Sequence, residues 1–139
     1  EAIREFCRRT GQTVPETRED ILRTIFESLA LKYRHVFELL KEMHPEPINR
    51  LHIVGGGSAN MLLNRFTASA LGVPVIAGPT EATAIGNLLV QAMALGELES
   101  LADIRRVVRE SFELKEIHPE DHEKWNNAYE RYVELMKDA

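Results

Sequence analysis

Apolar residues recur at intervals of three and four positions along much of the chain, which is the spacing of one face of an α-helix. The longest such stripe runs from Ile21 to Met43. Thr17 and Asp20 resemble a capping box at its start, and Pro45 ends it. A helix of about 26 residues spans about 39 Å. That length is large for a chain of 139 residues, so we expect this helix to lie across a larger body.

Shorter periodic stretches predict five further helices. They cover residues 2–10, 61–71, 81–95, 101–110 and 119–136. Gly11, Gly72 and Gly96 follow three of them, and glycine suits the position after a helix because it tolerates a left-handed backbone. Trp125 and Tyr129, with Tyr132, recur on one side of the last helix, which predicts that this side packs against the body.

The helix predicted over residues 81–95 begins with small side chains. Thr80 stands where a capping residue is expected, and Ala82, Ala84 and Gly86 leave little bulk on the first turns. A glycine inside a helix costs up to about 1 kcal/mol relative to alanine. We therefore interpret this stretch as a closely packed helix start, and favour packing over direct contact with a ligand.

Two short apolar runs rich in β-branched residues predict buried strands at 51–54 and 73–76. With the helix between them they form a right-handed βαβ unit, which gives a parallel pair. Two parallel strands do not make a stable sheet by themselves. We therefore expect an incomplete sheet and a chain that is part of a larger protein. The alternating residues 112–117 offer a third strand, which would lie at an edge.

A glycine-rich turn follows the first predicted strand. It consists of Gly55, Gly56, Gly57 and Ser58, and Asn60 comes two residues later. Three successive glycines cost backbone entropy, and close approach of a ligand to the backbone is a physical reason for that cost. Free amides at a helix start attract phosphate, and an amide side chain can both donate and accept at an adenine edge. The alternative is a tight turn that binds nothing.

Other phosphate-binding patterns are absent from this turn. No Gly-Lys-Ser/Thr follows the glycines, so the turn is not a P-loop. Asn60 occupies the third glycine position of a dinucleotide fingerprint. The second predicted strand ends in Ile76-Ala77-Gly78, without an acidic residue to hold a ribose.

Composition and charge argue against several classes of partner and site. The net charge is −5, and no basic stripe is present, so we expect no nucleic-acid partner. No apolar stretch reaches the roughly 18 residues of a membrane span, and we expect a cytoplasmic protein. Cys7 is the single cysteine, which excludes an internal disulfide. His118 and His122 have helical spacing, but Pro119 separates them and no third ligand is evident, so we expect no metal site.

Taken together, these stretches resemble the C-terminal lobe of FGGY-type carbohydrate kinases, which belong to the actin-like ATPase superfamily. The resemblance covers the chain from about Ile3 to Gly96 and is carried by residues 52–60 (HIVGGGSAN), 62–64 (LLN), 70–75 (ALGVPV) and 81–87 (EATAIGN). Within the family, the sequence is most similar to members that act on L-rhamnulose. The segments that carry this similarity are residues 10–15, 27–33 and 51–57, together with Gly86-Asn87.

The resemblance implies an α/β fold of the actin-like, ribonuclease H-like type, with residues 1–139 forming part of the ATP-side lobe. It implies transfer of the γ-phosphoryl group of ATP to a ketose, L-rhamnulose giving L-rhamnulose 1-phosphate. A fuculokinase or xylulokinase-like enzyme is the near alternative, and a lobe that binds nucleotide or a partner without catalysis is the alternative of another class. By match to the family, Gly55, Gly56 and Gly57 contact the adenosine end and the α-phosphate. Asn60 faces adenine, and Ser58 is the less certain member of this set.

Phosphoryl transfer also needs a proton acceptor and a magnesium site. The carboxylates of this chain, such as Glu38 and Glu110, fall on polar helix faces, so we expect no catalytic residue here. In the family the catalytic Asp, most sugar contacts and the groups that hold Mg²⁺ lie in the N-terminal portion. We therefore expect the chain alone to be inactive and to bind ATP weakly at best. Apolar surface left without the other lobe could make the isolated chain form a homodimer.

Overall fold

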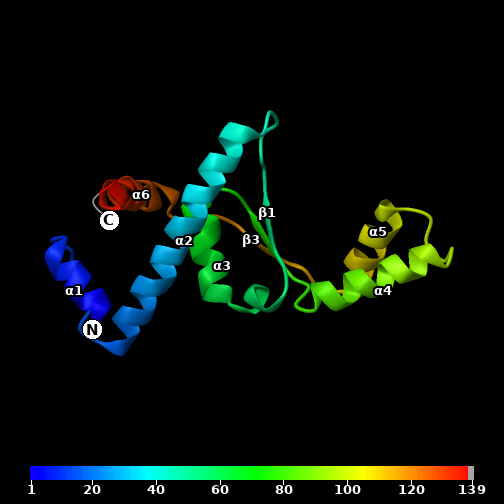
Figure 1. Ribbon diagram of the computed structural model, residues 1–139, viewed down its shortest axis with the longest axis horizontal. Coiled ribbons are helices and arrows are strands. Elements are labelled where there is room, and N and C mark those ends of the chain that lie inside the picture. The colour runs from blue at the N-terminus through cyan, green and yellow to red at the C-terminus, as the bar shows by residue number, and fades with distance from the viewer. Residues whose placement is uncertain (138–139) are drawn as a thin grey trace.

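The structure is a computed structural model that describes residues 1–137. Its elements in chain order are α1 (Ala2–Arg9), α2 (Arg18–Met43), β1 (Leu51–Ile53), the 3-10 turn η1 (Gly56–Ala59), α3 (Met61–Leu71), β2 (Val75–Ala77), α4 (Ala82–Ala94), α5 (Leu101–Ser111), β3 (Lys115–Ile117) and α6 (His122–Lys137). Figure 1 shows α2 crossing the body diagonally, with α3 beside it and α4 and α5 extending to one side.

The sheet has three strands in the order β1-β2-β3. β1 and β2 are parallel, with Leu51 opposite Val75, which confirms the predicted parallel pair. The second strand begins at Val75, because the preceding residue is Pro74, which has no amide hydrogen to donate. The central strand β2 is buried along its whole length.

The stretch 112–117 does supply a third strand, and it lies at an edge as the alternation allowed. β3 is antiparallel to β2, with Ala77 opposite Lys115 and Val75 opposite Ile117, so the sheet is mixed rather than purely parallel. The reason is the connection: α4 and α5 leave from the carboxyl end of β2, and the chain returns into the sheet at that same end. A connection of this kind reverses the strand direction.

α3 is the centre of packing. Its side chains contribute to two clusters, one between α2 and α3 and one between α3 and the sheet. The first cluster contains Ala30, Phe37, Ala70 and Leu71, and the second contains Ala68, Val75, Ala77 and Ile117. The sheet and α2 therefore lie on opposite sides of α3, and this arrangement holds the start of α3 and the glycine-rich turn in place.

α6 packs against α2 and α3 through its aromatic side, as the spacing predicted. The Trp125 ring centroid is 5.4 Å from that of Phe66, and the Arg34 guanidinium lies 4.4 Å from the centroid of Tyr129. Partial burial raises the pKa of Tyr129 and Tyr132.

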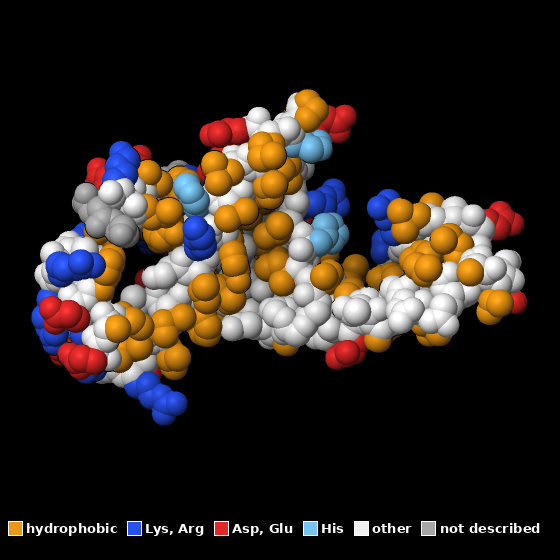
Figure 2. All heavy atoms as spheres, in the orientation of Figure 1, with side chains coloured by type: hydrophobic (Ala, Val, Ile, Leu, Met, Phe, Trp, Pro, Cys, Tyr) orange, Lys and Arg blue, Asp and Glu red, His pale blue; other side chains and the backbone are white. Residues whose placement is uncertain are grey.

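α2 has the predicted capping box and the predicted length. The Thr17 hydroxyl accepts a hydrogen bond from the Asp20 amide, and the Asp20 carboxylate accepts one from the Thr17 amide, both at 3.1 Å. These contacts lower the pKa of Asp20. Only Ala30 and Phe37 of this helix are buried, and Met43 is 81% exposed. Figure 2 shows the apolar side chains that remain exposed along α2.

α4 and α5 pack against each other and extend away from the sheet (Figure 1). No residue of α4 is buried, and Leu88 is 67% exposed. The expectation that Gly86 allows close packing is wrong within this chain, since a Cβ at Gly86 would meet no atom within 4 Å. Capping by Thr80 is also wrong, because α4 begins after Glu81 without a side-chain cap. The open surroundings of Gly86 agree with the exposure of α4, which packs on α5 and not on the sheet within residues 1–137.

Replacing Gly86 with alanine should raise the free energy of unfolding of the 139-residue chain by up to about 1 kcal/mol. The added methyl group meets open space, and alanine has the higher helix propensity. Urea denaturation measures the change. A loss of stability in Gly86→Ala would contradict the open surroundings of this position.

None of the helices in residues 1–137 is both long enough and apolar enough to cross a lipid bilayer.

Candidate functional site

The glycine-rich turn leaves the carboxyl end of β1 and is closed by its own hydrogen bonds. The Gly55 amide donates to the Pro79 carbonyl at 3.0 Å, and the Gly55 carbonyl accepts from the Ser58 amide and hydroxyl at 3.0 and 2.7 Å. Gly55 has φ 74° and ψ −164°, a conformation available almost only to glycine. The first glycine is therefore required by the backbone, and both its polar atoms are used within the protein.

Gly56 and Gly57 are different, because they face open space. A Cβ at Gly56 would meet no atom within 4 Å, and one at Gly57 would meet only the Ile53 side chain at 3.9 Å. Both residues are exposed, and neither amide donates a hydrogen bond to any group in residues 1–137. The fold itself thus does not require glycine at these two positions. These two residues therefore leave an accessible stretch of backbone whose amide donors are unused within residues 1–137.

The expectation that the glycine amides lie at the start of a helix, where the helix dipole would also favour phosphate, is wrong. Gly56 and Gly57 belong to the four-residue turn η1, and α3 begins only at Met61. The dipole of a helix builds up over several aligned turns, which η1 does not have. Any attraction of the glycine amides for a phosphate group therefore comes from the local N–H groups themselves.

The side chains of Ser58 and Asn60 are placed differently from the sequence-based interpretation. Ser58 is buried, and its hydroxyl is used on Gly55, so this side chain points into the protein. Asn60 lies directly before α3 and is its N-cap. Its Oδ1 accepts from the Leu63 amide at 3.1 Å, which leaves the Nδ2 group as a donor. Asn60 can donate to a ligand here, but its acceptor is already engaged.

The turn between β2 and α4, residues 78–80, lies beside the glycine-rich turn. The Gly78 amide donates to the Ile53 carbonyl at 2.9 Å, and a Cβ at Gly55 would lie 3.9 Å from the Thr80 carbonyl oxygen. The backbone of residues 78–80, and not the small residues of α4, therefore lies against the glycine-rich turn, because the chain turns there between β2 and α4.

Sequence reasoning missed one residue of this region, Asn64. Its side chain is fully buried on α3, and its Nδ2 donates to the Ser58 carbonyl at 2.9 Å. A signal was present in the sequence: Asn64 stands three, four and seven positions before Thr67, Ala68 and Leu71, on the buried face of the helix. A polar side chain on a buried face needs a partner, and here the partner is the glycine-rich turn.

The remaining candidate residues do not assemble into a site. His122 Nδ1 lies 2.7 Å from the Ser69 carbonyl oxygen, whereas His118 faces Glu116 at 3.8 Å. In residues 1–137 no three His, Cys, Asp or Glu side chains gather as metal ligands. Cys7 is buried and makes no disulfide. The histidine pair thus has a role in packing at most.

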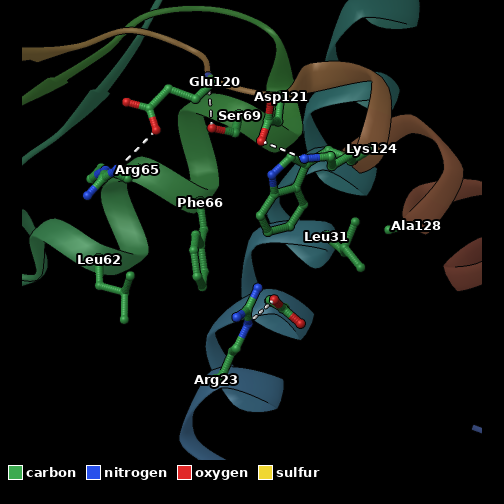
Figure 3. A pocket seen from close by; sticks show the side chains of 12 residues that line it. Arg23, Leu31, Leu62, Arg65, Phe66, Ser69, Glu120, Asp121, Lys124 and Ala128 are labelled. Atoms are coloured by element: carbon green, nitrogen blue, oxygen red, sulfur yellow. Dashed lines mark hydrogen bonds and ion pairs between the residues drawn. The ribbon is translucent and has the colours of Figure 1, made fainter. Parts of the chain in front are cut away.

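A hollow of about 400 Å³ lies between α2, α3 and α6, with Phe66 and Trp125 among the residues that line it (Figure 3). Its charged side chains are joined as ion pairs: Arg23 with Glu27, Arg65 with Glu120, and Lys124 with Asp121. These basic groups are neutralised by their neighbours, so the hollow does not offer a strong site for an anion.

Comparison of the sequence with known proteins identifies the family to which the chain belongs. Residues 1–95 match the family described as "FGGY family of carbohydrate kinases, C-terminal domain". The chain is 57% identical over 137 residues to a rhamnulokinase of Bacteroides thetaiotaomicron, covering 99% of this chain and 28% of that protein. It is 42% identical to a rhamnulokinase of Pectobacterium atrosepticum over the same shares of each chain.

A solved structure agrees with the fold. The crystal structure of xylulose kinase from Rhodospirillum rubrum superposes with a TM-score of 0.69 at 23% identity, over 92% of this chain and 26% of that one. The expected fold class, a helix-rich α/β lobe of the actin-like ATPase type, is confirmed.

The chain belongs to the FGGY family of carbohydrate kinases, and its residues 1–95 match the C-terminal domain of that family. Its curated relatives named here are rhamnulokinases, and the chain spans about 28% of their length.

Proposed function

We propose that this chain is the ATP-side lobe of a sugar kinase that transfers the γ-phosphoryl group of ATP to a ketose, with L-rhamnulose as the acceptor. Membership of the FGGY family and the identity to rhamnulokinases support the reaction and the substrate. The observation that carries the proposal is the exposed backbone of Gly56 and Gly57, with two unused amides and no side chain above them.

The five residues of the turn then have different parts in binding ATP. Gly56 and Gly57 provide a backbone surface free of side chains for the adenosine end and N–H groups for the α-phosphate. Asn60 offers its Nδ2 group to an acceptor on the adenine ring. Gly55 and Ser58 act through the backbone, since their hydrogen bonds to each other hold the turn in the shape that presents its neighbours.

The chemical step relies on groups outside residues 1–137. Magnesium prefers carboxylate, phosphate and water oxygens, and the hydrogen bonds made by the turn within the described residues include no carboxylate. The turn therefore does not fit Mg²⁺. The base that accepts the sugar hydroxyl proton is expected in the N-terminal portion, and the chain alone is expected to be inactive. A cytoplasmic location belongs to the same proposal, since the cytoplasm supplies ATP as donor.

A substrate panel on the full-length protein tests the proposed reaction. ATP consumption is measured with L-rhamnulose, L-fuculose and D-xylulose as acceptors. The proposal expects the highest kcat/KM with L-rhamnulose. A higher kcat/KM with either other ketose would overturn the substrate, and no ketose-dependent ATP consumption would overturn the kinase activity.

Replacing Asn60 with serine should weaken ATP binding by about 1 kcal/mol, roughly fivefold, because one hydrogen bond is lost. Serine is also a good N-cap, so α3 should keep its start. The KM for ATP in the full-length enzyme measures the loss, with GTP as the comparison. An equal effect on ATP and GTP would count against a contact with adenine.

A further inference from the structure

Asn64 connects the glycine-rich turn to the most buried helix of the structure. It lies on α3, one turn after the N-cap Asn60, and none of its surface is exposed. Its backbone amide belongs to the first turn of the helix and donates to the Asn60 carbonyl at 3.0 Å. Its side-chain Nδ2 reaches back and donates to the Ser58 carbonyl at 2.9 Å. One residue thereby holds both ends of the segment from Ser58 to Asn60.

Ser58 is the residue whose hydrogen bonds close the glycine-rich turn. The Ser58 amide and hydroxyl both donate to Gly55, so Ser58 is held from one side by the first glycine and from the other by Asn64. Gly56 and Gly57 lie between these two attachments. With no side chains of their own to fix them, their orientation depends on Gly55 and Ser58.

Burying the side-chain amide of Asn64 costs folding free energy, and packing alone does not explain why this residue is present. Its Oδ1 is buried and has no hydrogen-bond partner in residues 1–137. The two ends of the amide are fixed by chemistry, because only Nδ2 can face the Ser58 carbonyl oxygen. A leucine has a similar volume and would fill the same space without an unpaired acceptor. The useful feature of Asn64 is thus its donor to the turn.

We propose that Asn64 is a positioning residue for ATP binding, acting through the Ser58 carbonyl to hold the Gly56-Gly57 backbone in its exposed arrangement. This inference rests on the proposed function of the turn. Loss of the Nδ2 donor frees the Ser58 carbonyl, and the turn then has several conformations, of which one accepts the nucleotide. The effect is on the affinity for ATP and leaves the site for the ketose unaltered.

Asn64→Leu in the full-length enzyme tests this proposal by steady-state kinetics. We expect the KM for ATP to rise about tenfold, while the KM for the ketose stays within about twofold of the unsubstituted enzyme. Asn64→Asp serves as a second variant if the leucine variant does not fold. It keeps the shape and places an oxygen in front of the Ser58 carbonyl, so it should raise the KM for ATP at least as much.

Thr67→Val is the matched control. Thr67 lies on the same helix and is equally buried, and within residues 1–137 its hydroxyl donates only to the Leu63 carbonyl of its own helix. Thr67→Val should leave both KM values unchanged. Equal rises in the KM for ATP and for the ketose in Asn64→Leu, or a matching rise in Thr67→Val, would overturn the positioning role in favour of general packing.

Gly56→Val separates failure of this inference from failure of the proposed function. If Gly56→Val raises the KM for ATP and the Asn64 variants do not, the positioning role is wrong and the turn still binds ATP. If neither substitution changes the KM for ATP, the proposed function of the turn is wrong, and the inference falls with it.

Discussion

Replacing Gly56 with valine in the full-length enzyme is expected to raise the KM for ATP more than tenfold while the protein still folds. The site supports both halves of this expectation. A Cβ at Gly56 meets no protein atom within 4 Å, so the fold tolerates it. The same open space is where the nucleotide is proposed to lie against the backbone, and a branched side chain there excludes it. Tenfold corresponds to about 1.4 kcal/mol, and exclusion of the ligand should cost more.

Gly56→Val is compared with Gly86→Ala, because Gly86 also has open surroundings and lies on α4, outside the turn. The control should leave the KM for ATP unchanged. Circular dichroism and thermal unfolding establish that both variants are folded. A folded Gly56→Val enzyme with unchanged affinity for ATP would show that this glycine does not face the nucleotide.

Gly72→Ala should lower the free energy of unfolding of the 139-residue chain by about 2–3 kcal/mol. Gly72 ends α3 with φ 71°, a left-handed conformation that costs an alanine roughly 1–2 kcal/mol. In addition, the new Cβ would lie 2.6 Å from Cε1 of His122. That ring is held in place, since its Nδ1 is 2.7 Å from the Ser69 carbonyl oxygen.

Gly11→Ala isolates the backbone part of this effect. Gly11 has φ 62°, similar to Gly72, but a Cβ there would meet nothing within 4 Å. Urea denaturation should therefore show a smaller loss for Gly11→Ala than for Gly72→Ala. Combining Gly72→Ala with His122→Ala should recover part of the difference. Equal losses at the two glycines would contradict a steric contact between α3 and α6.

The parts of the fold that follow from local patterns could be predicted from the sequence. The stripe from Ile21 to Met43 defined α2 closely, and the pairing of Thr17 with Asp20 defined its start, because periodicity and capping are properties of neighbouring residues. The two apolar runs gave the parallel pair for the same reason. The direction of β3 was not predictable in this way, since it depends on where α4 and α5 return the chain to the sheet.

In the candidate site, too, some features follow from neighbouring residues in the sequence and others depend on the tertiary structure. The position of the glycine-rich turn after a strand was evident, but the separate tasks of its glycines were not. Gly55 is needed for its positive φ, whereas Gly56 faces open space, and the letters of the sequence do not distinguish them. The part played by Asn64 depends on a hydrogen bond across six residues, which becomes visible only once the 3-10 turn is placed before α3.

The most direct test of the account follows the glycine amides of the turn while ATP binds. The full-length protein is labelled with 15N-glycine and titrated with a non-hydrolysable ATP analogue, and amide signals are recorded by NMR. The account predicts that the signals of Gly56 and Gly57 shift together as the analogue saturates the protein, while those of Gly11 and Gly96 stay in place. Saturation of the protein without movement of the Gly56 and Gly57 signals would contradict it.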